Sequence, residues 1–139
     1  MNTIQQTDQR ISSILGRVGY QAVVRRGRDT ENRVMWAFEN ATVSVPLWFG
    51  CIDRASREQD LYRGIDFVVE TRDMGKIYLQ VKSSQIFAQK FRFKQSKRRY
   101  NKYIAVVVLD ENTIAADAVC DRVISAVSKI RNKLLALRK

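Results

Sequence analysis

The chain has 139 residues, 45% of them hydrophobic and 28% charged, with a formal net charge of +11. This length fits one domain with a single core, and no apolar run approaches the roughly 18 residues of a membrane span, so we expect no membrane partner. The absence of histidine excludes histidine-based catalysis. The two cysteines, Cys51 and Cys120, are far apart, which argues against a zinc site or disulfides and favours free buried thiols.

The sequence also lacks a signal peptide and two nucleotide-binding motifs. The N-terminus, MNTIQQTDQR, lacks the regions of a signal peptide, so we expect a cytoplasmic protein. The chain also has neither GxxxxGK[ST] nor GxGxxG, which argues against a nucleotide site.

The first half of the chain predicts two helices and a strand. Apolar residues at helical spacing indicate a helix over about 8–17, and YQAVVRR is expected to be extended. A second helix should begin at Asp29 or Thr30 and reach about 40. TVSVPLW then indicates a strand that its proline places at an edge or an end. The buried face of the second helix should hold Val34, Met35, Phe38 and Ala41.

The second half predicts a hairpin, a further strand and a long helix. The polar segment 51–63 is expected to be a loop or to hold one short helical turn. GIDFVVE and KIYLQVKSS are two strands around TRDMG, and YIAVVVL is a strand covered on both faces and central in the sheet. The last helix should span about 115–137, with an apolar stripe that fits either core packing or a dimer seam. This order predicts an α/β sandwich with a mixed sheet.

The hairpin gathers three polar side chains on one face. Closing it at TRDMG places Asp66 opposite Gln80 and Lys82. The alternate residues Ile65, Phe67, Val69, Ile77, Leu79 and Val81 should form the packing face. An aspartate and a second oxygen ligand can hold Mg²⁺ or Mn²⁺, and an ammonium nearby can orient water or stabilise a phosphoryl transition state.

This pattern resembles the PD-(D/E)XK nuclease superfamily. The residues that carry the resemblance are GID, a gap of fourteen positions from Asp66 to Gln80, and QVK. The superfamily includes restriction enzymes, Mrr-like enzymes and Holliday-junction resolvases, and the resemblance implies a restriction-endonuclease-like αβββαβ core over roughly 29–137. It also implies Asp66, Gln80 and the Val81 carbonyl as metal ligands and Lys82 as the catalytic lysine.

Three details qualify the resemblance. Ile65 stands where many members have proline, and Gln80 replaces the usual acid, so metal affinity should be weaker, although QxK variants are regarded as active. Many members carry an acidic residue on the first core helix, and Glu31 is the candidate for a catalytic and metal-binding role. Its alternative role is a first-turn glutamate favoured by the helix dipole, and it has no role if the core helix is 8–17.

The positive charge is concentrated in the second half. Residues 1–86 hold 12 Lys and Arg against 10 Asp and Glu, a net +2, whereas residues 87–139 hold 13 against 4, a net +9. Within the segment KFRFKQSKRRYNK, the stretch FRFK alternates like a strand with its phenylalanines buried. We expect its cations to bind nucleic acid, although a solvated face, an acidic protein or anionic lipid would also account for them. These cations are Lys90, Arg92, Lys94, Lys97, Arg98, Arg99 and Lys102, and Lys129, Arg131, Lys133, Arg138 and Lys139 could extend the surface.

Three functions follow as hypotheses. The leading one is a Mg²⁺-dependent DNA endonuclease that acts on double-stranded or branched DNA. Cutting two strands would suit a homodimer. The second is a non-catalytic nucleic-acid-binding module on the same fold, and the third is a module for an acidic protein partner. The sequence alone does not distinguish DNA from RNA as the substrate.

Overall fold

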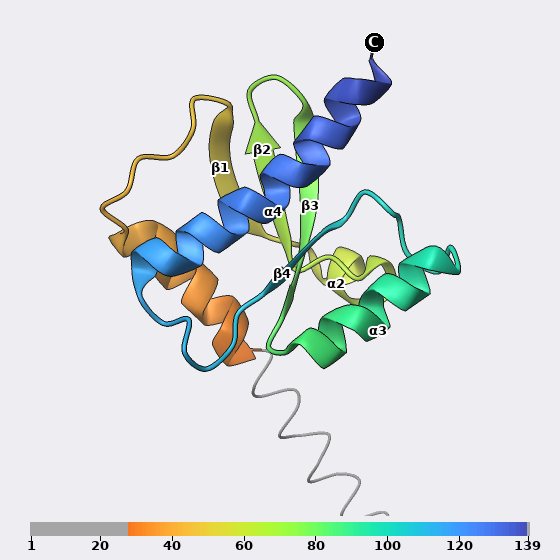
Figure 1. Cartoon of the computed structure of the whole chain (residues 1–139), viewed down its shortest axis with the longest axis horizontal. Coiled ribbons are helices and arrows are strands. Elements are labelled where there is room, and N and C mark those ends of the chain that lie inside the picture. Colours follow the sequence, from red (N-terminus) through yellow and green to blue (C-terminus); the bar gives the residue numbers. More distant parts are fainter. Residues whose placement is uncertain (1–27, 139) are drawn as a thin grey trace, which may run out of the picture.

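The computed structural model describes residues 28–138, and the predicted helix over 8–17 and the extended YQAVVRR lie outside them. Its centre is a four-stranded mixed sheet in the order β1-β2-β3-β4 (Figure 1). The strands are β1 (Phe49–Arg54), β2 (Phe67–Thr71), β3 (Gly75–Lys82) and β4 (Ala105–Val108). The first three are antiparallel, and β4 runs parallel to β3. The predicted α/β class with a mixed sheet is therefore confirmed.

Helices cover both faces of this sheet. The helix over residues 28–40 and α4 (Ala116–Leu137) contribute buried side chains to one face, and α3 (Gln85–Ser96) packs on the other. A short helix, α2 (Arg57–Arg63), lies between β1 and β2 in the chain. Figure 1 shows α4 crossing in front of the strands while α3 lies to one side of β4.

The hairpin of β2 and β3 has the predicted register. Phe67 pairs with Leu79 and Val69 with Ile77, and all four side chains are buried in the core that α4 covers. Ile65 differs from the prediction, because it packs on the opposite face with Phe91 and Ile104. The chain bends before β2 begins, so strict alternation does not extend to Ile65.

Two predicted strands are placed differently by the structure. The strand expected at TVSVPLW lies further along the chain, as β1, where Phe49 and Ile52 are buried and the backbone pairs with β2. The backbone before it turns, with Phe49 N–H donating to the Pro46 carbonyl. The segment 51–63, expected to be a loop or to hold one short helical turn, forms most of β1 and the whole of α2; the short helix agrees with the second alternative, and the strand was not predicted. β4 is an edge strand and not the central one, although side chains cover both of its faces.

The first half of the basic segment, residues 90–96, is helical and not strand-like, and residues 97–102 follow the helix. Ser84 caps α3 by accepting a hydrogen bond from Phe87 N–H, and Ala88 and Phe91 form its buried side. Helical spacing therefore separates the two phenylalanines of FRF. Phe91 is buried and Phe93 is 63% exposed, which contradicts the prediction that both are buried.

The long C-terminal helix is confirmed, and its apolar stripe packs into the core. Val119, Val123, Val127 and Ile130 are buried, whereas Leu137, at the end of the stripe, is 65% exposed. Cys120 is also buried, but Cys51 is an exposed free thiol, contrary to the expectation that both are buried. No helix within residues 28–138 combines the length and apolarity needed to cross a bilayer.

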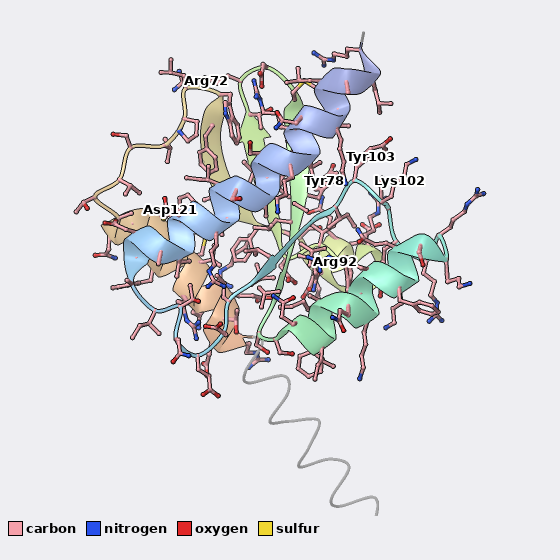
Figure 2. All side chains as sticks on the ribbon, in the orientation of Figure 1. Arg72, Tyr78, Arg92, Lys102, Tyr103 and Asp121 are labelled. Atoms are coloured by element: carbon pink, nitrogen blue, oxygen red, sulfur yellow. The ribbon has the colours of Figure 1, made fainter. Side chains whose placement is uncertain are left out.

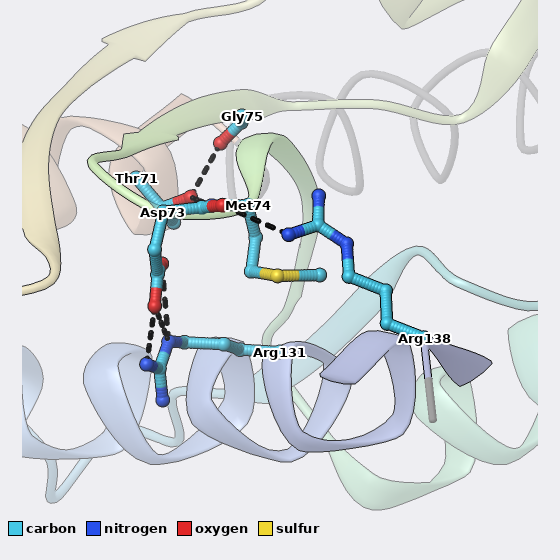
Figure 3. A network of polar contacts seen from close by, with 6 residues as sticks. All are labelled: Thr71, Asp73, Met74, Gly75, Arg131 and Arg138. Atoms are coloured by element: carbon cyan, nitrogen blue, oxygen red, sulfur yellow. Dashed lines mark hydrogen bonds and ion pairs between the residues drawn. The ribbon is translucent and has the colours of Figure 1, made fainter. Parts of the chain in front are cut away.

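The turn of the hairpin is fastened to α4 (Figure 3). Arg131 forms an ion pair with Asp73 and lies 5.0 Å from the centre of the Trp48 ring, and Arg138 donates to the Asp73 carbonyl. Within the turn, the Thr71 hydroxyl donates to the Gly75 carbonyl and accepts from Met74 N–H. Arg131 is therefore engaged inside the molecule and is not a free cation of the basic surface.

The stripe of α4 can be tested by truncating a buried and an exposed side chain. We expect Val123→Ala to lower the free energy of unfolding by about 2 kcal/mol, because the surrounding core cannot fully close the cavity. Leu137→Ala removes more carbon atoms but from an exposed position, so its effect should stay within about 0.5 kcal/mol. Urea unfolding measures both, and equal losses would contradict the packing described.

Candidate functional site

Asp66 directly precedes β2, and its side chain is almost completely buried. Its backbone N–H donates to the Leu79 carbonyl at 2.8 Å, and its Oδ2 accepts a hydrogen bond from Val81 N–H at 2.8 Å. Only 8% of the residue is exposed. The carboxyl group is thus fixed by the neighbouring strand, as the register of the hairpin predicts.

Two further carboxyl groups meet Asp66. One oxygen each from Glu31, Asp60 and Asp66 lies within 4.8 Å of the others. Glu31 comes from the first turns of the helix over 28–40, and Arg54 at the end of β1 lies 3.7 Å from its Oε2. We call these three residues the acidic cluster.

The local sequence explains how Asp60 arrives there. Ser56 and Gln59 form a capping box that begins α2, with each side chain accepting a hydrogen bond from the other residue's backbone N–H. Gly64 ends the helix in the left-handed conformation, with φ 66°. A Cβ there would lie 3.0 Å from the rings of Phe91 and Tyr100, so this close approach of α2 to α3 requires glycine.

Sequence reasoning missed Asp60. The segment that holds it was expected to be a loop or to hold one short helical turn, and no role was given to its acids, yet the sequence contained a usable signal. Ser56-x-x-Gln59 is the pattern of a capping box, and it would have predicted a helix with Asp60 in its first turn.

Burial raises the pKa of two members of the cluster, Asp66 and Glu31. Desolvation raises the pKa of Asp66 to about 8, and the neighbouring Glu31 and Asp60 add to the rise, while the bond from Val81 N–H opposes it. Desolvation likewise raises the pKa of Glu31, against a hydrogen bond with Asp66. Three carboxyl groups at one point favour either a shared proton or a bound cation.

Gln80 supplies a neutral oxygen on the same face. It is 7% exposed, and its Oε1 has no hydrogen-bond partner among the described residues. A buried acceptor without a donor is costly, and a cation would satisfy it. Carboxylate and amide oxygens are the ligands that Mg²⁺ and Mn²⁺ prefer. The three carboxyl groups of the acidic cluster therefore fit a divalent cation, and Gln80, which lines the same cavity as Asp60, is a further candidate ligand.

Lys82 completes the site beside a cavity of about 270 Å³. Its Nζ lies 5.4 Å from the centre of the Phe91 ring, and desolvation lowers its pKa, against the attraction of Asp66. The Phe91 and Tyr100 rings stack with centres 4.9 Å apart and form an apolar wall. The other polar residues that line the cavity are Asp60, Gln80, Lys90 and Lys94.

The remaining predicted residues do not form a single surface. Lys90 and Lys94 line the site cavity, whereas Arg92 and Lys102 line a different cavity on the other side of α3. Arg98 and Arg99 lie after the helix and border a third hollow, and Lys97 lies over the Phe93 ring. Val81 contributes its backbone N–H to Asp66, and its side chain is buried in the core.

Comparison of the chain with family models, with curated proteins and with solved structures gives no match.

The raised pKa of Asp66 predicts an unusual pH dependence of stability. The folded state holds this proton up to a pH of about 8, against an ordinary pKa of 3.8, so its contribution is complete below about pH 4 and is lost as the pH rises toward 8. We expect Asp66→Asn, measured by urea unfolding in EDTA, to be more stable than the wild type at pH 8.5 by at least about 2 kcal/mol, since each pKa unit corresponds to about 1.4 kcal/mol. At pH 4 the two proteins should differ little.

Asp73→Asn is the matched control. Its hydrogen bond with Arg131 lowers the pKa of Asp73, so this carboxylate is charged throughout the range from pH 5 to 8.5. The substitution should therefore leave the difference in stability between these two pH values unchanged. A wild type that is as stable at pH 8.5 as at pH 5, with Asp66→Asn behaving alike, would contradict the protonation described.

Proposed function

We propose that the chain is a metal-dependent endonuclease of the PD-(D/E)XK type that hydrolyses phosphodiester bonds in DNA. One observation carries the proposal: Asp66 of the acidic cluster is buried against β3, and β3 also carries the half-buried Lys82 and the amide oxygen of Gln80, which is buried and has no hydrogen-bond partner among residues 28–138. This combination provides oxygen ligands for a cation and an ammonium beside the same cavity.

The order of elements supports the proposal. A helix precedes three antiparallel strands, and a helix and a parallel strand follow, with Asp66 at the start of the second strand and Gln80 and Lys82 on the third. This order is compatible with the αβββαβ core that the resemblance implies, with α2 and α4 as additional helices. Asp66 and Lys82 stand where the resemblance expects the metal ligand and the catalytic lysine.

Each residue of the site has a distinct task in the proposed reaction. Glu31, Asp60, Asp66 and Gln80 would hold Mg²⁺ or Mn²⁺, and the resemblance adds the Val81 carbonyl. When bound, the ion would supply positive charge to offset that of the phosphate and would lower the pKa of a water molecule. Val81 N–H fixes the orientation of Asp66. Lys82 donates hydrogen bonds to the attacking water or to a phosphate oxygen. The Phe91 and Tyr100 rings keep bulk water from this lysine.

Asp60 can supply the negative charge that the neutral Gln80 lacks. Replacing the usual acid by an amide removes one negative charge from the ligand set. Asp60 reaches the same point from α2 and restores a carboxylate. The set then has three carboxyl groups and one amide, which is enough charge for a divalent cation.

The neutral Gln80 also favours a second candidate, a nucleic-acid-binding module without catalysis. In this case the acidic cluster would remain as a protonated remnant, and the cations of α3 would bind the phosphate backbone. The two candidates differ in whether cutting depends on a divalent ion and on Asp66.

Cleavage of supercoiled plasmid DNA tests the proposal. We expect cutting by the wild type with Mg²⁺ or Mn²⁺ and none in EDTA. Asp66→Ala and Lys82→Ala should each lower the rate at least about a hundredfold, the scale of losing one group that stabilises the transition state. Glu39→Gln, an exposed position on the same helix as Glu31, is the control and should cut like the wild type. DNA binding without divalent-dependent cutting, unchanged in Asp66→Ala, would support the module instead.

The ligand set can be tested without activity. Mn²⁺ should raise the melting temperature of the wild type, since an ion that binds only the folded state stabilises it. Asp60→Asn should reduce this rise by removing a charged ligand, and Gln80→Glu should lower the Kd for Mn²⁺ by about tenfold or more by adding one. Glu39→Gln again serves as the control. If Mn²⁺ shifts all variants equally, the ion does not bind at the acidic cluster.

A further inference from the structure

A second, larger hollow lies on the other side of α3. Its volume is about 600 Å³, and α3, β4 and α4 form its walls. Figure 2 shows Arg92 in the space between α3 and α4 and Lys102 on the segment that leads into β4. We call this hollow the β4 groove, because the edge strand β4 forms its floor.

The β4 groove is strongly basic. Arg92 and Lys102 line it from α3 and the following loop. On α4, positions 122, 129 and 133 are spaced by seven and four residues, so that they share one face of the helix. They hold Arg122, Lys129 and Lys133, and the single acid of the groove is Asp121.

None of these five cations forms an ion pair within the described residues, although Arg122 lies close enough to Asp110 to lower the pKa of that carboxyl group. The ion pairs found in residues 28–138 join Arg54 to Glu31 and Arg131 to Asp73. Arg122 donates to the Val108 carbonyl, which holds it against β4 without cancelling its charge. Residues 85–109, which include α3 and β4, contain no acid. Five cations against one carboxylate repel one another unless an anion binds.

We propose that the β4 groove binds the phosphate backbone of a nucleic acid, at a surface separate from the catalytic cavity. The inference deepens the proposed function and rests on its choice of nucleic acid as partner. The stripe from Arg122 to Lys133 is about 16 Å long at 1.5 Å per residue, which matches about five phosphates of one strand. A second copy of the chain does not suit the groove, because it would bring two sets of cations together.

The helix α3 connects the two surfaces. Lys90 and Lys94 line the catalytic cavity on one flank, and Arg92 lines the β4 groove on the other. The exposed Phe93 stands between the flanks, away from the core. A nucleic acid in contact with both cavities therefore crosses α3, with Phe93 available to pack against it.

The test compares two double variants that remove the same charge. Lys129→Gln/Lys133→Gln changes the β4 groove at exposed positions, and Arg72→Gln/Lys76→Gln removes two exposed cations elsewhere. Figure 2 shows Arg72 far from Arg92 and Lys102, and Lys76 lies at the opposite end of β3 from Lys82. All proteins also carry Asp66→Asn and are measured in EDTA by fluorescence anisotropy with labelled duplex DNA, so that cutting does not enter.

We expect the groove variant to bind at least about tenfold more weakly at 0.15 M salt, and its slope of log K against log salt to be less steep by about two, since each phosphate contact contributes about 0.9. The control should keep the wild-type slope and lose much less affinity. Equal losses in both variants would overturn the inference, as would wild-type affinity in the groove variant. If the protein that carries Asp66→Asn alone binds poly-glutamate but not DNA, the inference is also overturned, and the partner of the groove is an acidic protein.

The same measurements separate this inference from the proposed nuclease. The proposed nuclease is supported and the role of the β4 groove is rejected if plasmid cutting depends on Asp66 and the two double variants lose equal affinity for DNA. The role of the β4 groove is supported and the proposed nuclease is rejected if DNA binding depends on Lys129 and Lys133 but no plasmid is cut. Thermal melting of both variants establishes that they are folded.

Discussion

The burial of the Asp66 carboxyl group is the constraint on which the candidate site depends. Removing a carboxylate from water costs several kcal/mol unless a partner compensates, and one hydrogen bond from Val81 N–H compensates only in part. The fold nevertheless adds Glu31 and Asp60 to the same point, which raises the cost further. Selection for stability alone would not gather these groups. The arrangement is consistent with a site that exchanges its proton for a cation, and that loses stability at neutral pH when it holds neither.

The two charge distributions of the molecule depend on each other in the proposed function. The acidic cluster alone repels a phosphate, and the cations of α3 alone attract one without reacting with it. Lys82, Lys90 and Lys94 line the cavity that Asp60 and Gln80 also line. With a divalent ion on the cluster, the local repulsion becomes attraction, and the cations on both flanks of α3 then act in the same direction. The strong overall positive charge therefore offsets, over a wider surface, the local cost of placing acids where a phosphate must approach.

The sequence predicted the parts of this protein that strong local patterns determine. Alternation and the turn residues specified the hairpin of β2 and β3, its register and the meeting of Asp66 with Gln80 and Lys82. Helical periodicity specified α4 and the helix that carries Glu31. The errors fall where tertiary contacts decide. Residues 49–54 are a strand because they pair with β2, and α3 is a helix although FRFK alternates, because Phe91 alone can be buried beside Tyr100. α2 is short, and its capping box was the one signal that would have located Asp60.

The position of α2 couples the acidic cluster to the wall around Lys82. A helix of seven residues has little stability of its own, and α2 depends on its capping box and on Gly64 for its place. Gly64 brings the backbone against the Phe91 and Tyr100 rings, where a Cβ would come within 3.0 Å of both, and its positive φ also favours glycine. The same Phe91 ring lies under Lys82. The contact that positions Asp60 therefore also fixes the apolar surface that desolvates Lys82, so that a shift of α2 would move a candidate metal ligand and alter the environment of the candidate catalytic lysine in a single step.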